Sequence, residues 1–399
     1  MTSPADAERL IGAHLTCLPI ESLPLSQCSG AVLRENIYGE RDAPPFDRVA
    51  MDGIALRAAA VTALRREFIV QGRQAAGDPP MALASDDHCI ETMTGAMLPT
   101  GCDAVVPVER IERRADRARV ADGLVVASGM NVHRRGTDAR QGALLLAAGT
   151  RLDSPAIAVA ASAGMARVRV SAQPAIAVIS TGNELVDPGE PIAPHQVRRS
   201  NVYAVCTALR EHGWTRVVDD HVRDDLEQLR LRLRFHLETR DVLILSGGVS
   251  VGAYDLVPQA LRDLGVREVF HSIEQRPGRP MWFGVGPGGQ AVFGLPGNPV
   301  STLVCLVRYV VPALDAAMGL APREPPRLAL GADIEIRHGL TSFVPVRLRR
   351  DEWAREWADP RPPNGSGDFT SLTATDGFVE LPPGPNRYAK GFVANYWHW

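Results

Sequence analysis

Short apolar runs and helical stretches alternate along the middle of the chain, from about residue 174 to residue 318. Each apolar run ends at glycine or another small residue, which is typical of strands buried on both faces of a parallel sheet. The predicted strands are 175–180, 216–221, 241–245, 266–273, 280–285 and 290–295, and the predicted helices are 202–211, 226–237, 255–264 and 298–318. This alternation predicts a doubly wound, mostly parallel α/β sheet.

The regions on either side of this unit are mainly β-patterned. Short strands cut by turns predict a β-rich insertion at 68–71, 89–93, 104–110 and 123–126. After residues 322–326, strands at 327–336, 343–348, 377–381 and 388–396 predict a small C-terminal β-barrel or sandwich. Helices are predicted at 4–16, with Ser3 as N-cap, and at 154–164, with Ser154 as N-cap and Pro155 in the first helical position.

The composition limits the classes of function. The chain has 399 residues, 45% of them hydrophobic and 22% charged, which is typical of a globular protein of several domains. A net charge of −3 gives no general attraction to nucleic acid or to anionic membranes. Six scattered cysteines without a CxxC pair favour reduced thiols over disulfides or a zinc site. No signal peptide and no apolar stretch of about 20 residues is recognised, so we expect a cytoplasmic protein.

A glycine-rich turn follows the predicted strand 241–245. It carries Gly247, Gly248, Ser250 and Gly252 and ends at Asp255. Glycines at the carboxyl end of a buried strand let backbone N–H groups approach a ligand, and a following helix start adds partial positive charge. The stretch therefore predicts an anion site, most simply for phosphate, with Asp255 as a candidate ligand for a cation.

The same turn also matches GxSxG at residues 248–252, the pattern around the nucleophile of α/β-hydrolases, so a serine hydrolase using Ser250 is an alternative. A second alternative is a purely structural turn that only joins the strand to a helix. Against the hydrolase, no Asp-then-His arrangement follows Ser250 in the order a triad requires.

Three further motifs follow predicted strands of the same sheet. Glu184 lies just after the strand 175–180 and could share a site with Asp255, because two carboxylates plus phosphate oxygens suit Mg²⁺. Arg276 and Arg279 flank a Pro-Gly turn, and arginine forks suit phosphate or other oxyanions. The third motif, after strand 290–295, begins a long helix whose cap is Asn298 or Ser301; it contains Pro296, Gly297, Asn298 and Ser301. Each motif alone also fits a purely structural turn or helix start.

Together the motifs resemble the molybdopterin molybdenumtransferase family, which includes MoeA and the E domain of gephyrin. The resemblance covers the chain almost from end to end, with the family's motifs in order. They are PPFDRVAMDGIA at 44–55, MTGAMLPTGCDAVVPVE at 93–109, HRRGTD at 133–138, ISTGNELVDPGE at 179–190, SGGVSVGAYD at 246–255, RPGRP at 276–280 and GLPGNPVS at 294–301.

This resemblance implies an enzyme of the last step of molybdenum cofactor synthesis. Such proteins insert molybdate into adenylylated molybdopterin and release AMP with Mg²⁺, as elongated homodimers of four-domain subunits. With the element pattern, it implies an α/β molybdopterin-binding domain (1–22 and 173–318), a small linking α/β domain (23–41 and 142–172), a β-rich domain (42–141) and a C-terminal β-barrel (319–399).

The resemblance also implies roles for single residues. Asp52, Thr94, Asp138 and Asp224 match catalytic residues of the cleft, and Glu184 and Asp255 match the Mg²⁺ ligands. Substrate binding is implied for Gly247, Gly248, Ser250, Arg276, Arg279, Pro296, Gly297, Asn298, Ser301 and Ser366. Molybdoenzymes or other proteins of cofactor synthesis are candidate partners.

Several positions depart from the family pattern. Acids usual in the family are replaced at Asn183, Arg199 and Ala253, a lysine is replaced at Ser272, and an arginine expected just before Phe343 is absent. Such changes suit a divergent member. Besides a working molybdenum insertase and a Ser250 hydrolase, a molybdopterin-binding paralogue with redirected chemistry, such as a carrier for a molybdoenzyme, is therefore a further hypothesis.

Overall fold

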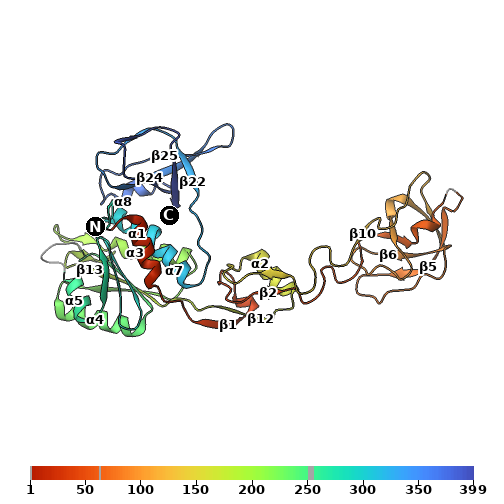
Figure 1. Ribbon diagram of the computed structural model, residues 1–399, viewed down its shortest axis with the longest axis horizontal. Coiled ribbons are helices and arrows are strands. Elements are labelled where there is room, and N and C mark those ends of the chain that lie inside the picture. Colours follow the sequence, from red (N-terminus) through yellow and green to blue (C-terminus); the bar gives the residue numbers. More distant parts are fainter. Residues whose placement is uncertain (1, 63, 250–255) are drawn as a thin grey trace.

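The computed structural model describes residues 2–62, 64–249 and 256–399, and it shows an elongated chain (Figure 1). A unit built on a large α/β sheet carries a β-barrel on one side. A narrow middle unit then connects it to a β-rich unit at the far end (Figure 1). Buried side chains form separate clusters in these units. The domain boundaries given above remain a prediction.

Six strands form the central sheet of the α/β unit, and the first four in spatial order are parallel. In that order they are β16 (Val217–Val222), β13 (Ile176–Thr181), β17 (Val242–Ser246), β21 (Ala291–Leu295), β20 (Trp282–Val285) and β18 (Arg267–His271). β20 runs antiparallel to both β21 and β18. The prediction of a mostly parallel sheet is confirmed.

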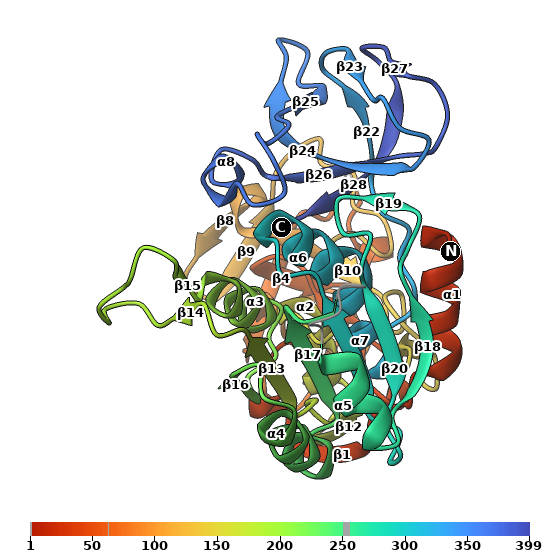
Figure 2. The same cartoon turned by 90° about the vertical axis from the view of Figure 1, so that its left-hand side faces the viewer.

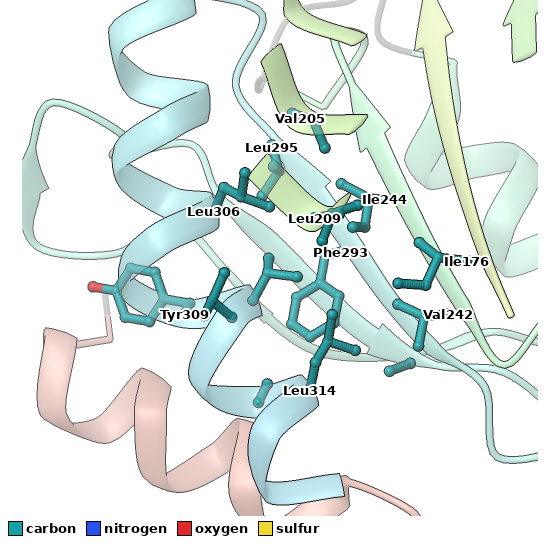
Figure 3. Close-up of a cluster of buried hydrophobic side chains, with 14 of the residues drawn as sticks. Ile176, Val205, Leu209, Val242, Ile244, Phe293, Leu295, Leu306, Tyr309 and Leu314 are labelled. Atoms are coloured by element: carbon teal, nitrogen blue, oxygen red, sulfur yellow. The ribbon is translucent and has the colours of Figure 1, made fainter. Parts of the chain in front are cut away.

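Helices cover both faces of this sheet because its strands are apolar on both faces. One face packs on α1 (Pro4–His14), α3 (Ser200–Glu211), α6 (Pro299–Cys305), the π-helical turn η4 (Leu306–Val310) and α7 (Val311–Ala317). The other face packs on α4 (Leu226–Thr239) and α5 (Val257–Asp263). Figure 3 shows Ile244 and Phe293 of the sheet directed toward Leu209 of α3 and Leu314 of α7.

Among the residues that the structure describes, one helical stretch, Pro299–Ala317, is long and apolar enough to cross a membrane. It comprises α6, η4 and α7, and 78% of its most apolar window is buried inside the structure. This burial is what the core helix of a folded domain shows.

The middle unit consists of two antiparallel strand pairs and one helix. β1 (Ile20–Pro24) pairs with β12 (Arg167–Ser171), and β2 (Ile37–Tyr38) pairs with β11 (Leu144–Leu146). Helix α2 (Ser154–Ser162) starts one residue earlier than predicted, because Asp153 and not Ser154 is the N-cap. The Asp153 carboxylate accepts a hydrogen bond from Ala156 N at 2.9 Å.

The β-rich unit has a six-stranded sheet and a two-stranded one. The large sheet runs β7 (Ala104–Pro107), β4 (Gly53–Leu56), β6 (His88–Thr92), β5 (Glu67–Gln74), β9 (Arg117–Val120) and β8 (Ile111–Arg114), and β3 (Arg48–Val49) pairs with β10 (Val132–His133). The strand predicted at 123–126 is wrong. The strand lies instead at 117–120, where Ala118 and Val120 point into the core, and Gly123, at φ +77°, belongs to the turn that follows.

Five strands close into the C-terminal barrel, confirming the predicted barrel. They are β24 (Thr341–Arg350), β25 (Glu356–Pro360), β22 (Arg327–Leu330), β28 (Val393–His398) and β26 (Gly377–Leu381), and β26 pairs back to β24. Short elements complete it: α8 (Phe369–Leu372), β23 (Ile334–Glu335) and β27 (Arg387–Tyr388). β19 (Gln275–Arg276) of the α/β unit extends this sheet by pairing with β24, so the barrel is attached directly above the central sheet (Figure 2).

A buried arginine also joins the barrel to the α/β unit. Arg308 in η4 is only 5% exposed. Its guanidinium contacts Glu8 of α1 at 3.0 Å and Glu380 of β26 at 3.0 Å, and it lies over the ring of Trp397 at 4.6 Å. A single side chain thus ties together α1, the core helix and the barrel.

Candidate functional site

The carboxyl ends of β13, β17 and β21 meet at one edge of the sheet because these strands are parallel. Gly247 and Gly248 follow β17 with φ of +96° and +65°. A Cβ atom at Gly247 would lie 2.8 Å from the carbonyl oxygen of Thr181, and one at Gly248 would lie 2.8 Å from Thr181 Oγ1. Side chains are thus excluded at this turn, and the backbone itself faces the edge. Ser250 and Asp255, predicted at the same site, lie outside the described residues.

Buried polar atoms lie around this turn. Asn201 of α3 donates to Ser246 Oγ at 3.0 Å and to the carbonyl oxygen of Gly297 at 2.8 Å, which ties the ends of β17 and β21 together. Within the described part of the chain, Ser180 Oγ, Thr181 Oγ1 and Asn201 Oδ1 are buried and have no hydrogen-bond partner. Buried polar groups are normally paired, so unpaired groups at this edge fit a site that a polar ligand completes.

Glu184 and Asp224 lie on neighbouring loops at the same edge of the central sheet. Their predicted roles remain predictions. Asn183 N donates to Asp224 Oδ2 at 3.2 Å, and Asp224 N donates to Asn183 Oδ1 at 3.3 Å. Glu184 is exposed, and its carboxylate folds back over Gly182, where an added Cβ would lie 2.5 Å from Glu184 Oε2. The loop is therefore built around an accessible carboxylate.

The loop with Arg276 and Arg279 is fixed from beneath by buried side chains. Gln275 Nε2 donates to the carbonyl oxygen of Pro277 at 3.1 Å, and Tyr309 OH donates to Gln275 Oε1. Arg279 accepts a backbone hydrogen bond from Ile273 N at 2.8 Å. Arg276 is exposed at the start of the turn, at the seam with the barrel. The turn thus carries two arginines on a support of buried side chains.

The start of α6 contributes the remaining residues of this edge. Asn298 is the N-cap residue but forms no side-chain capping bond, and Ser301 is buried within the helix, so Ser301 is not the cap. Thr302 Oγ1 donates to the carbonyl oxygen of Pro296 at 2.6 Å. Val300 N donates to the carbonyl oxygen of Ser366 at 3.0 Å, which places the Ser366 loop of the barrel over the helix start.

Asp52, Thr94 and Asp138 form a second group, in the β-rich unit. Asp52 Oδ1 accepts from both Thr94 N and Thr94 Oγ1 at 2.7 Å, and these two bonds lower the pKa of Asp52 below its ordinary value of 3.8. Asp138 Oδ1 contacts His133 Nε2 at 2.9 Å. The loops that carry them interlock, since Val49 N donates to Ala96 O at 2.9 Å and Ala50 N to Asn131 O at 3.0 Å.

The two groups do not meet within one chain. The first lies on the central sheet and the second in the unit at the opposite end of the molecule (Figure 1). Among the described residues, no three or more His, Cys, Asp or Glu side chains gather as a metal site. Two contacts were not predicted from the sequence: that of Asn201 with the ends of β17 and β21, and that of His133 with Asp138.

Comparisons with known proteins agree along the whole chain. Residues 2–164 match the family described as MoeA N-terminal region (domain I and II). Residues 177–316 match the family of probable molybdopterin binding domains, and residues 327–399 match the MoeA C-terminal region (domain IV).

Relatives of similar length carry one name. The chain is 38% identical to the molybdopterin molybdenumtransferase of Synechocystis sp., covering 100% of both chains, and 32% identical to molybdopterin molybdenumtransferase 2 of Mycobacterium tuberculosis, covering 100% of this chain and 99% of that one. A solved structure of a molybdopterin biosynthesis MoeA protein from Pyrococcus horikosii has a TM-score of 0.82 and 31% identity, over 100% of this chain and 99% of that one. The chain belongs to the molybdopterin molybdenumtransferase family.

Proposed function

We propose that this chain inserts molybdenum from molybdate into adenylylated molybdopterin with Mg²⁺-dependent release of AMP, as the last step of molybdenum cofactor biosynthesis. Its family makes it a transferase of that pathway. The observation that carries the detailed proposal is the set of unpaired buried polar atoms around Gly247, Gly248 and Gly297. A glycine turn at a strand end suits phosphate groups, and this ligand joins a pterin phosphate to an adenylate.

Residues at this edge suit Mg²⁺ and oxyanions. Mg²⁺ takes one or two carboxylates and completes its shell with phosphate oxygens and water, so exposed Glu184 with Asp255 would hold it without a third protein acid. Bound there, Mg²⁺ would neutralise charge on the phosphate oxygens. Arg276 and Arg279 are assigned to the anionic groups of the substrates, as arginine forks suit oxyanions.

The second group supplies carboxylates for proton transfer. Release of AMP by water breaks one phosphorus–oxygen bond and forms another, and the attacking water must give up a proton. Asp52, whose depressed pKa keeps it ionised near neutral pH, and Asp138 are assigned as groups that can accept that proton or orient the water. These roles require both groups to face one substrate.

A second copy of the chain could bring the two groups of residues together. In a two-fold dimer, the β-rich unit of one copy would face the central sheet of the other, giving two equivalent sites. The elongated shape, with the two groups at opposite ends, supports this arrangement (Figure 1). We therefore propose an antiparallel homodimer, located in the cytoplasm.

Mixing two inactive variants tests the shared site. Asp52→Asn disables the β-rich half, and Glu184→Gln disables the sheet half. Random pairing makes half of the dimers mixed, and each mixed dimer retains one intact site, so the mixture should recover about a quarter of the wild-type rate of AMP release. Differently tagged copies, purified through both tags, provide the mixed dimers. Mixed dimers that copurify but show no recovered activity would refute the shared site.

The glycine turn gives a test of substrate binding. Gly247→Ala should weaken the affinity for adenylylated molybdopterin by roughly ten- to a hundredfold, because an added Cβ meets Thr181 O at 2.8 Å and the φ of +96° is strained for alanine. Gly213→Ala is the matched control, since Gly213 has a similar φ of +90° but no atom within 4 Å of the added Cβ. Calorimetric titration measures the affinity of both variants. Equal affinities would contradict the assignment of the glycine turn to substrate binding.

The alternatives considered from the sequence are less well supported. The serine hydrolase reading depends on Ser250, which lies outside the described residues, and family membership favours the transferase. A carrier for a molybdoenzyme would bind adenylylated molybdopterin without releasing AMP. Measuring AMP and active cofactor after incubation with adenylylated molybdopterin, molybdate and Mg²⁺ separates the carrier from the insertase.

A further inference from the structure

Three side chains of the β-rich unit form a continuous chain of contacts that ends on Asp138. Arg48 Nη2 lies 3.1 Å from His133 Nδ1, and His133 Nε2 lies 2.9 Å from Asp138 Oδ1. Arg48 and His133 are direct partners in the antiparallel pair of β3 and β10, so the backbone register sets their contact. Asp138 is held by its own backbone, since Asp138 N donates to the carbonyl oxygen of Ala43 at 2.9 Å.

The chemistry of these groups fixes the hydrogen atoms. A guanidinium group can only donate hydrogen bonds, so Nδ1 of His133 must accept from Arg48 and carry no hydrogen. The ring hydrogen therefore sits on Nε2 and is donated to the Asp138 carboxylate. A ring with hydrogens on both nitrogens would place an N–H group against the N–H groups of Arg48.

Other charges nearby are already engaged. Arg134 and Arg135, which follow His133 along the chain, pair with Asp47 at 2.7 Å and with Asp42 at 2.7 Å. The side chains of His133 and Asp138 are 35% and 56% exposed, so a substrate can reach the carboxylate while the ring holds it. Arg48 thus acts on Asp138 through a single imidazole ring.

We propose that Arg48 and His133 are positioning residues for Asp138: Arg48 selects the Nε2–H tautomer of His133, and that N–H fixes the rotation of the Asp138 carboxylate toward the substrate. Neither residue touches the reacting atoms in this arrangement. The assignment rests on the proposed role of Asp138 in AMP release. In many enzymes a carboxylate orients a catalytic histidine; here a histidine would orient a catalytic carboxylate.

Arg48→Met removes the donor and keeps the length of the side chain. We expect the kcat for AMP release to fall about tenfold, as for other residues that orient a catalytic group, with KM for adenylylated molybdopterin changed less than about twofold. Arg48→Lys, which also donates, should restore most of the loss. Arg117→Met removes an exposed arginine of β9 in the same unit and should change neither constant.

A second measurement reads the tautomer directly and needs no activity. Protein with ¹⁵N-labelled histidine, studied at about pH 8 where unperturbed imidazole is neutral, should show His133 as the Nε2–H tautomer, assigned by the loss of its signals in His133→Gln. Arg48→Met should lower the share of the Nε2–H tautomer, because the Asp138 carboxylate alone then selects it, and Arg48→Lys should keep the wild-type share.

These readouts separate the possible failures. An unchanged tautomer in Arg48→Met, or a fall in kcat equalled by Arg117→Met, overturns the positioning role. A wild-type protein that shows the single tautomer but releases no AMP contradicts the proposed function instead, and leaves the arginine–histidine contact established.

Discussion

Replacing Asp52 with asparagine is expected to lower the rate of AMP release by about 10²–10⁴-fold, the range for loss of a general acid or base. Asparagine has nearly the same shape, and its Oδ1 can still accept from Thr94 N and Thr94 Oγ1, which Asp52 holds at 2.7 Å. The substitution therefore removes the charge and the capacity to take a proton while the loop keeps its contacts. Steady-state AMP release by wild type and variant measures the difference.

Asp78→Asn is the matched control. Asp78 Oδ2 also accepts a backbone hydrogen bond, from Ala75 N at 2.8 Å, in an exposed turn of the same unit, and its loss of charge should leave the rate unchanged. A rate for Asp52→Asn within about threefold of the control would remove Asp52 from the proton-transfer step.

The pKa of Asp52 also fixes the pH dependence of its loop. Because the hydrogen bonds from Thr94 lower the pKa in the folded state, the Asp52–Thr94 contact stabilises the fold above the ordinary value of 3.8. That contribution is lost as the pH falls through the depressed folded-state pKa.

Replacing Arg308 with methionine is expected to destabilise the attachment of the barrel by about 3–5 kcal/mol, as for other buried ion pairs that lose one partner. The variant would leave Glu380, whose side chain is 14% exposed, without its guanidinium, and it would remove the cation from the face of Trp397. The midpoint of the first transition in urea, followed by tryptophan fluorescence, reports the change.

A second substitution separates the lost charge pair from lost packing. Glu380→Gln added to Arg308→Met removes the unpaired buried charge but keeps an acceptor for Trp397 Nε1, which contacts Glu380 at 3.2 Å. The double variant should recover part of the stability. If it is no more stable than Arg308→Met alone, the loss comes from packing around η4 and not from the ion pair.

The sheet was predictable from the sequence because its strands are apolar on both faces. The predicted ranges of β13, β17 and β21 differ from the observed ones by a residue or so. β25 could not be found in this way, since Glu356-Trp357-Ala358-Asp359-Pro360 has only two apolar side chains and a proline at its end. Its pairing with β24 and β22 defines it as a strand.

The residues of the candidate site could be predicted from the sequence, but their arrangement in space could not. The motifs identified the glycine turn and the acids, yet they could not show that the β-rich unit, which carries Asp52, lies far from the central sheet, which carries Glu184 (Figure 1). The contact of Arg48 with His133 joins residues 85 positions apart through the register of two strands of two residues each, which no local pattern reveals.

A departure from the family pattern has a structural explanation here. Arg199 stands where the family usually has an acid, and it is buried with ion pairs to Asp187 at 2.7 Å and to Asp219. It therefore anchors the loop that joins β14 (Leu185–Val186), the strand directly after Glu184, to β15 (Val197–Arg198). Nothing in the described residues explains the change to Ser272.

During synthesis on the ribosome, helix α1 is formed long before the segments that pack against it are translated. Glu8 of α1 pairs with Arg308, Leu18 N donates to Ala317 O at 2.9 Å, and Thr2 pairs with Ile273. At about 5–20 residues per second, the ribosome needs roughly 15–60 s to synthesise the intervening chain. The β-rich unit, whose strands β3 to β10 follow one another along a single stretch of sequence, can fold during that interval. Helix α1 must meanwhile stay without these partners, and its apolar face is a target for chaperones until α7 leaves the exit tunnel.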